Sequence, residues 1–146
     1  MAKAPRDCPC FSGARYASCC GPLHRGEMTA TAPEVLMRSR YAAFALGLGD
    51  YLVDTLADDH EDRAHPRREL ALALSRSKDG HRFMGLEILD APPPADDATE
   101  AFVTFHARIF EKGKDQSFTE RSRFVKDASG AWRYASGDIV EEDDGE

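Results

Sequence analysis

The sequence predicts an α+β protein, in which N-terminal helices pack on an antiparallel sheet behind a small cysteine-rich element. Three observations support this prediction. All four cysteines lie within residues 1–26, apolar side chains recur at helical spacing in residues 28–77, and residues 83–139 change to a run of strand-like segments, with clear two-residue alternation at 101–109. Because helices and strands occupy separate parts of the chain, we expect the helices to cover one face of the sheet.

The cysteine-rich element predicts a zinc site. Eight residues separate Cys8 and Cys10 from the adjacent pair Cys19 and Cys20. Four thiolates satisfy a tetrahedral zinc ion at about 2.3 Å and leave no catalytic opening. Residues 1–26 have too few apolar side chains for a core of their own, so metal binding, worth about 10–16 kcal/mol, would fold them. We therefore predict that all four cysteines bind a structural Zn²⁺ ion.

Two alternative roles for the cysteines stay open. The adjacent thiols of Cys19 and Cys20 can oxidise, as in a redox pair, or all four thiols are simply free. A disulfide framework is disfavoured, because a reducing compartment keeps thiols reduced and neither close pair closes a relaxed ring. His24 is a candidate fourth ligand in place of Cys20.

Residues 33–46 are predicted to form the first long helix. Thr31 is the expected N-cap, Pro33 fits the first turn, and Glu34 completes a capping box. Side chains three or four residues apart predict one buried face: Val35, Leu36, Ser39, Ala42, Ala43 and Leu46.

Two shorter helices are predicted next. Gly47 and Gly49 interrupt the first helix, and Asp50 is expected to cap a second helix that reaches Leu56. A third helix is predicted over residues 66–77. The arginines near its start are expected to be solvated: Arg63, Arg67 and Arg68.

The rest of the chain predicts four strands, over residues 83–89, 101–109, 118–125 and 131–139. In the second, the odd positions from 101 to 109 are apolar and most even positions are polar, as in a strand with one wet face. Ser129 and Gly130 are expected in the turn before the last strand.

Composition and charge exclude several classes of protein. The chain of 146 residues is 42% apolar and 31% charged, as in a globular protein. Its net charge of −7 comes largely from the acidic tail at residues 141–146, which we expect to be disordered. There is no basic stripe typical of nucleic-acid binders and no apolar run near the roughly 18 residues that span a bilayer. Since a cysteine precedes any apolar stretch, no secretory signal is expected, and the predicted location is cytoplasmic.

Residues 8–22 resemble a known zinc motif. They read CPCFSGARYASCCGP, which is similar to the SEC-C motif also found at the C-terminus of the translocation motor SecA. Phe11 stands where this motif usually has glycine. Residues 36–44 and 120–124, with shorter segments at 49–52, 85–88 and 132–134, resemble the YchJ family of small bacterial proteins.

The resemblance implies a fold but no reaction, because the YchJ family has no established activity. It implies a SEC-C-like zinc knuckle at residues 1–26, followed at residues 27–140 by a cone-like α+β domain of the nuclear-transport-factor and SnoaL type. Residues 141–146 form the tail.

A cone fold leaves a cavity between its helices and its curved sheet. Glu120 shares a strand face with Phe118, Ser122 and Phe124, so it is a carboxylate in an otherwise mainly apolar set. A buried carboxylate needs a partner, and we expect an ion pair with an arginine of the first helix, Arg38 or Arg40. The residues predicted to contact a ligand are Arg38, Tyr41, Glu120 and Trp132.

These features favour a cytoplasmic, zinc-containing binding or adaptor protein. The knuckle would contact a protein partner, as the similar motif of SecA does, and the cone would make a second contact or hold a small apolar ligand. Two alternatives remain. One is a small enzyme with Glu120 or Asp138 as the base, although the sequence shows no catalytic constellation, and the other is a thiol redox protein.

Overall fold

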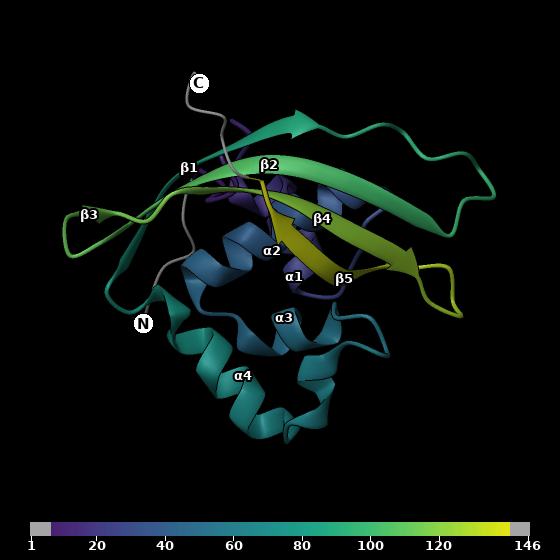
Figure 1. Cartoon of the computed structure of the whole chain (residues 1–146), viewed down its shortest axis with the longest axis horizontal. Coiled ribbons are helices and arrows are strands. Elements are labelled where there is room, and N and C mark those ends of the chain that lie inside the picture. The colour runs from purple at the N-terminus through teal and green to yellow at the C-terminus, as the bar shows by residue number, and fades with distance from the viewer. Residues whose placement is uncertain (1–6, 141–146) are drawn as a thin grey trace.

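A curved antiparallel sheet lies over a layer of helices in the computed structural model, which describes residues 7–140 (Figure 1). The predicted α+β class and the order of helices before strands are confirmed. The expected acidic tail, residues 141–146, lies outside the described residues. No helix within residues 7–140 is both long and apolar enough to span a bilayer.

The helices and strands follow the predicted order closely. The helical elements are η1 (Tyr16–Ser18), α1 (Cys20–His24), α2 (Pro33–Leu46), α3 (Gly49–Asp54), η2 (Glu61–Ala64), α4 (Arg67–Ser75) and η3 (Arg76–Lys78). The strands are β1 (His81–Asp90), β2 (Glu100–Glu111), β3 (Lys114–Asp115), β4 (Phe118–Lys126) and β5 (Trp132–Ile139). They pair in the order β1-β2-β4-β5, and the short β3 pairs with β2.

Two predicted helix caps are wrong. Pro33 is the first residue of α2, so the cap position falls on Ala32, which makes no side-chain cap hydrogen bond, and Thr31 lies outside the helix. In α3 the first residue is Gly49, so Asp50 lies within the first turn instead of capping it. Gly47 does end α2, with a left-handed φ of 74° that favours glycine.

Helix α2 is buried on more than the one face that the periodicity predicts. Leu36, Met37 and Tyr41 belong to the main core, where they meet the buried alternate residues of β2. Ala42 belongs to a second buried cluster, which contains the cysteines. Val35, predicted to be buried, is 37% exposed. The helix is therefore covered by the sheet on one side and by the N-terminal element on another.

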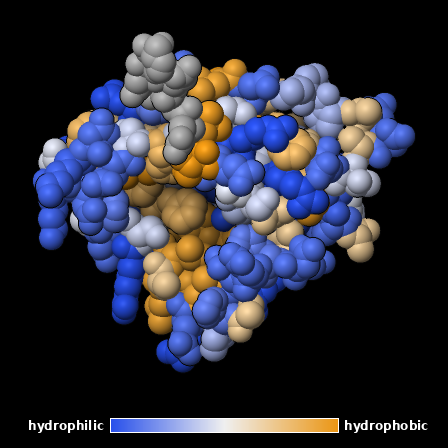
Figure 2. Space-filling model, in the orientation of Figure 1, coloured by the Kyte–Doolittle hydropathy of each residue, from blue (hydrophilic) through white to orange (hydrophobic). Residues whose placement is uncertain are grey.

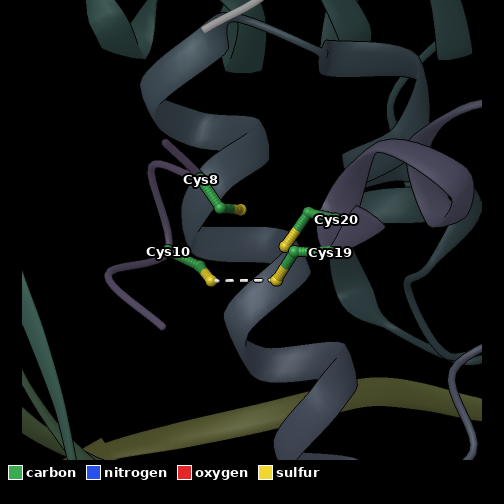
Figure 3. Close-up of side chains that lie close together, drawn as sticks. All are labelled: Cys8, Cys10, Cys19 and Cys20. Atoms are coloured by element: carbon green, nitrogen blue, oxygen red, sulfur yellow. Dashed lines mark hydrogen bonds between the residues drawn. The ribbon is translucent and has the colours of Figure 1, made fainter. Parts of the chain in front are cut away.

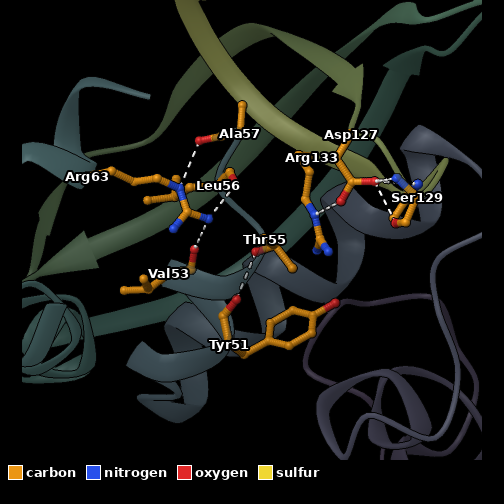
Figure 4. Close-up of polar contacts among 10 residues, drawn as sticks. Tyr51, Val53, Thr55, Leu56, Ala57, Arg63, Asp127, Ser129 and Arg133 are labelled. Carbon is orange, nitrogen blue, oxygen red and sulfur yellow. Dashed lines mark hydrogen bonds and ion pairs between the residues drawn. The ribbon is translucent and has the colours of Figure 1, made fainter. Parts of the chain in front are cut away.

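The chain after α3 is held at the edge of the sheet. Ala57 N donates to Tyr134 O, and Tyr134 N donates to Thr55 O, each at 2.8 Å. Arg63 was expected to be solvated, but its guanidinium donates to the carbonyl oxygens of Val53, Leu56 and Ala57 (Figure 4). These carbonyls lie in and just after the last turn of α3, where carbonyl oxygens keep room for further donors, which is why an arginine binds there.

The turn before β5 contains the predicted Ser129 and Gly130. The Asp127 carboxylate accepts hydrogen bonds from Ser129, from Ala131 N and from Arg133 Nε (Figure 4). These donors hold the pKa of Asp127 well below its usual range. The turn thus fixes where β5 begins.

Close packing of α3 on α4 depends on Gly49. A Cβ atom at this position would lie 1.8 Å from the carbonyl oxygen of Ala71 and 2.4 Å from Ser75 Oγ. Gly49 N also donates to Ser75 Oγ at 2.9 Å. The two helices can therefore stay this close only if residue 49 has no side chain.

We predict that Gly49→Ala lowers the free energy of unfolding by about 1–3 kcal/mol, because α4 must move to admit the methyl group. Gly85→Ala is the matched control, since its Cβ would meet Arg108 side-chain carbons at 3.5 Å or more. Urea unfolding of both variants measures the difference. Equal stability of the two variants would contradict the packing described.

Candidate functional site

The four cysteine side chains point toward one another from two segments of the chain (Figure 3). Cys8 and Cys10 come from the first loop, Cys19 is the N-cap of α1, and Cys20 is the first residue of that helix. All four sulfur atoms lie within 4.8 Å of one another, and Cys10 Sγ is 3.6 Å from Cys19 Sγ. Figure 3 places the cluster beside α2.

This arrangement fits a tetrahedral metal ion. A regular tetrahedron with bonds of about 2.3 Å to sulfur has sulfur–sulfur edges of about 3.8 Å. The observed sulfur–sulfur separations lie around that length, so small movements of the side chains would let the four sulfurs surround one ion. Cys8, Cys10 and Cys20 are buried and Cys19 is half-buried. The four cysteines can therefore hold a metal ion.

The loop around the first cysteine pair is a tight turn. Phe11 N donates to Cys8 O at 3.1 Å, and Phe11 has a φ of 61°, in the left-handed region. This explains why glycine would suit the position that Phe11 occupies. Ser12 Oγ accepts a hydrogen bond from Ala14 N and lies 3.2 Å from Cys19 Sγ, so its hydroxyl proton is free to bond the sulfur.

The thiols influence one another strongly. The hydrogen bond with Cys20 lowers the pKa of Cys10 to about 4 and raises the pKa of Cys20, whereas burial raises the pKa of Cys8 to about 11. Thiolates this close repel one another, so without a cation the cluster does not carry four negative charges. A bound cation would remove that repulsion.

The N-terminal element packs directly on α2. Ala42 is fully buried against the cysteine cluster, with Leu46 beside it. Arg38 Nη1 donates to Cys10 O at 3.1 Å, and His24 Nε2 lies 2.8 Å from Ser39 O. The cysteine loop and α1 are thus both tied to the same helix.

His24 supports this contact and is not placed as a metal ligand. Because a carbonyl oxygen only accepts, Nε2 donates to Ser39 O and Nδ1 accepts from the Tyr16 hydroxyl at 2.7 Å. Burial lowers the pKa of His24, which favours this neutral form. With both ring nitrogens engaged, His24 does not replace Cys20 in the cluster, contrary to that alternative.

A second candidate site is a cavity of about 340 Å³ between α2 and the sheet. Figure 2 shows an apolar hollow on this face, between the helices and the sheet. Its apolar walls come from α2, β1, β2 and β4: Met37, Tyr41, Phe44, Phe83, Phe105, Ala107, Ile109 and Phe118. The resemblance to cone folds correctly implied such a space.

Glu120 lines this cavity but does not form the expected ion pair. Its Oε2 accepts hydrogen bonds from Ser122 Oγ at 2.6 Å and from the Tyr134 hydroxyl at 3.0 Å. Arg40 is directed elsewhere, because Nη1 donates to Leu52 O and to Thr55 Oγ1. Two hydroxyl donors thus replace the arginine.

The four predicted ligand residues do not all meet. Tyr41 and Glu120 line the cavity. Arg38 does not, because its guanidinium turns to Cys10 O. Trp132 is buried in the core at the start of β5 and borders a different hollow, beside Leu36 and His24. Asp138, the other proposed base, is exposed and pairs in register with Arg121 on the outer side of the sheet.

Three residues around the cavity were missed or undervalued. Arg40 and Tyr134 line it, and the guanidinium carbon of Arg40 lies 4.7 Å from the centre of the Tyr134 ring. Gly137 leaves room for Glu120, since a Cβ there would lie 2.1 Å from Glu120 Oε2. Tyr134 could be predicted, because it lies two residues after Trp132 and so shares its strand face. Nothing in the neighbouring sequence indicates the role of Gly137.

The chain is similar to proteins of one bacterial family. The model of the YchJ middle NTF2-like domain matches residues 32–137. A UPF0225 protein of Vibrio vulnificus is 41% identical over 136 residues, or 93% of this chain and 77% of the relative. One from Streptomyces coelicolor is 40% identical over 135 residues, or 92% and 96% of the two chains.

Two solved structures have the same fold. The solution structure of a SEC-C motif containing protein from Rhodopseudomonas palustris matches with a TM-score of 0.75 and 36% identity, over 92% of this chain and 98% of that one. The crystal structure of a SEC-C motif containing protein from Psychrobacter arcticus matches with a TM-score of 0.73 and 25% identity, over 92% and 83%. The chain therefore belongs to the YchJ (UPF0225) family.

Proposed function

We propose that this chain is a zinc-containing binding protein, whose N-terminal knuckle contacts a protein partner and whose cone cavity holds a small ligand. The observation that carries the proposal is the convergence of four cysteine sulfurs on one point beside α2. A four-thiolate site has no open coordination position, so its role is structural. Thiolate ligands together with tetrahedral spacing favour zinc over harder cations.

The surface beside the cysteine loop supports a contact with a protein. Phe11 is 47% exposed although it sits at a strained, left-handed position, so its ring is retained at a conformational cost. The Phe11 ring packs edge-on against the Tyr41 ring, with 6.2 Å between the ring centres. It also borders a hollow of about 230 Å³ where the knuckle meets β1 and β2. An exposed aromatic ring beside a hollow is the kind of anchor that protein interfaces use.

We predict that protein purified without added metal contains one zinc ion per chain, with all four thiols protected from alkylation. Elemental analysis and a thiol count on the same sample measure both. Cys10→Ser should lose the metal, because it removes a fully buried sulfur, one of the four that converge, whereas Ser18→Ala should keep it.

A sample that holds no metal and readily forms a Cys19–Cys20 disulfide would contradict the zinc proposal. That result would favour the alternative of a thiol redox protein.

We predict that Phe11→Ser weakens capture of the protein partner by about tenfold, or about 1.4 kcal/mol, while the zinc content stays unchanged. Leu72→Ser is the matched control, because Leu72 is similarly exposed at 48% but lies on α4. Quantitative affinity capture with purified bait measures the difference. Equal capture by the wild type, Phe11→Ser and Cys8→Ser would show that the knuckle is not the contact surface.

A further inference from the structure

The cone cavity combines aromatic walls with two groups of opposite charge, the buried Arg40 and the half-buried Glu120. Its volume of about 340 Å³ is at the lower end of the roughly 300–1,000 Å³ of small-molecule sites. Mostly apolar walls with a few polar groups are typical of such sites. The polar groups therefore determine what kind of ligand fits.

Glu120 offers a hydrogen-bond acceptor. Both of its hydroxyl donors, Ser122 and Tyr134, bind the same atom, Oε2. The other oxygen, Oε1, has no hydrogen-bond partner among residues 7–140. A ligand with an N–H or O–H group can bond this oxygen without displacing any protein contact.

Arg40 offers hydrogen-bond donors to the same cavity. It is only 5% exposed, and Nη1 makes both of its hydrogen bonds, to Leu52 O and Thr55 Oγ1. Its Nε and Nη2 atoms donate to no residue in the part of the chain described, and Arg40 lines the cavity. Burial lowers its pKa only to about 10, so the guanidinium is charged at neutral pH.

Tyr134 separates the two charged groups. The guanidinium carbon of Arg40 lies 4.7 Å from the centre of the Tyr134 ring, and the Tyr134 hydroxyl donates to Glu120 Oε2. Arg40 forms no ion pair with any carboxylate in residues 7–140. A donor and an acceptor are thus held apart across one side chain, with space for a ligand beside them.

We propose that the cavity binds a neutral, mostly apolar molecule that bears a carboxamide, whose N–H donates to Glu120 and whose carbonyl accepts from Arg40. This proposal rests on the proposed ligand-binding role of the cone. The opposite charges of Arg40 and Glu120 offset each other, so a cation attracted by Glu120 is repelled by Arg40 and an anion meets the reverse. A carboxamide supplies both hydrogen bonds without adding charge, and its apolar body meets the aromatic walls.

Isosteric fragments that differ only in their polar group test this proposal. Benzamide, benzoate, benzylammonium and acetophenone are titrated into the zinc-loaded full chain, and amide shifts of Phe105, Glu120 and Tyr134 are followed by NMR. Benzamide is expected to bind about tenfold more tightly than each of the other three. Tighter or equal binding of any of the other three, or no cavity shift with benzamide at millimolar concentration, would overturn the proposal.

Glu120→Gln provides a readout that a purely apolar pocket would not show. It removes the negative charge that opposes an anion, so benzoate should bind more tightly than it does to the wild type and benzamide should lose its advantage. Glu87→Gln is the matched control, because Glu87 is exposed on β1 and does not line the cavity. An unchanged fragment preference in Glu120→Gln would overturn the proposal.

Measuring zinc in the same NMR samples separates this inference from the rest of the proposed function. Loss of benzamide binding with zinc present would contradict only the ligand assignment. Absence of zinc with benzamide binding intact would contradict the metal assignment and leave the ligand assignment standing.

Discussion

Packing of the N-terminal knuckle on α2 is the constraint on which both candidate sites depend. Four consecutive residues of this helix, 38–41, contact the knuckle or line the cavity. Arg38 and Ser39 donate or accept hydrogen bonds toward the knuckle, at Cys10 O and His24 Nε2. Arg40 and Tyr41 line the cavity, and the Tyr41 ring also meets Phe11 of the knuckle. A shift of the knuckle would therefore move α2, and with it the residues of α2 that line the cavity.

The knuckle itself has little apolar surface, and its order rests on sulfur and hydrogen bonds. Cys10 and Cys20 belong to one buried cluster with Cys8, Tyr16 and Ala42. Four thiolates at this spacing require a cation. In the proposed account zinc supplies that charge, so the metal acts as part of the packing of α2 and not as a reagent.

Local patterns were enough to predict much of the fold, whereas contacts between distant segments were not. The cysteine spacing and the alternation in β2 are local, and the structure agrees with both. The sequence could not predict that Arg40 lines the cavity and that Arg38 binds Cys10 O. The reason is that α2 is covered on two sides and has no fully polar face to orient it. A register shift between Arg123 and Phe124 sets Tyr134 opposite Phe124, beside the cavity, and leaves Trp132 at the far end of β5. Such irregularities are not visible in a two-residue pattern.

Hydrogen exchange with and without the metal tests most directly whether the knuckle holds α2 in place. Amides of α2 from Ala42 to Leu46 should exchange about tenfold faster after a chelator removes zinc, because the cover of that face is loosened. Amides of β4, which pairs with β2 and β5, should keep their rates. Unchanged protection along α2 after complete zinc removal would contradict the account.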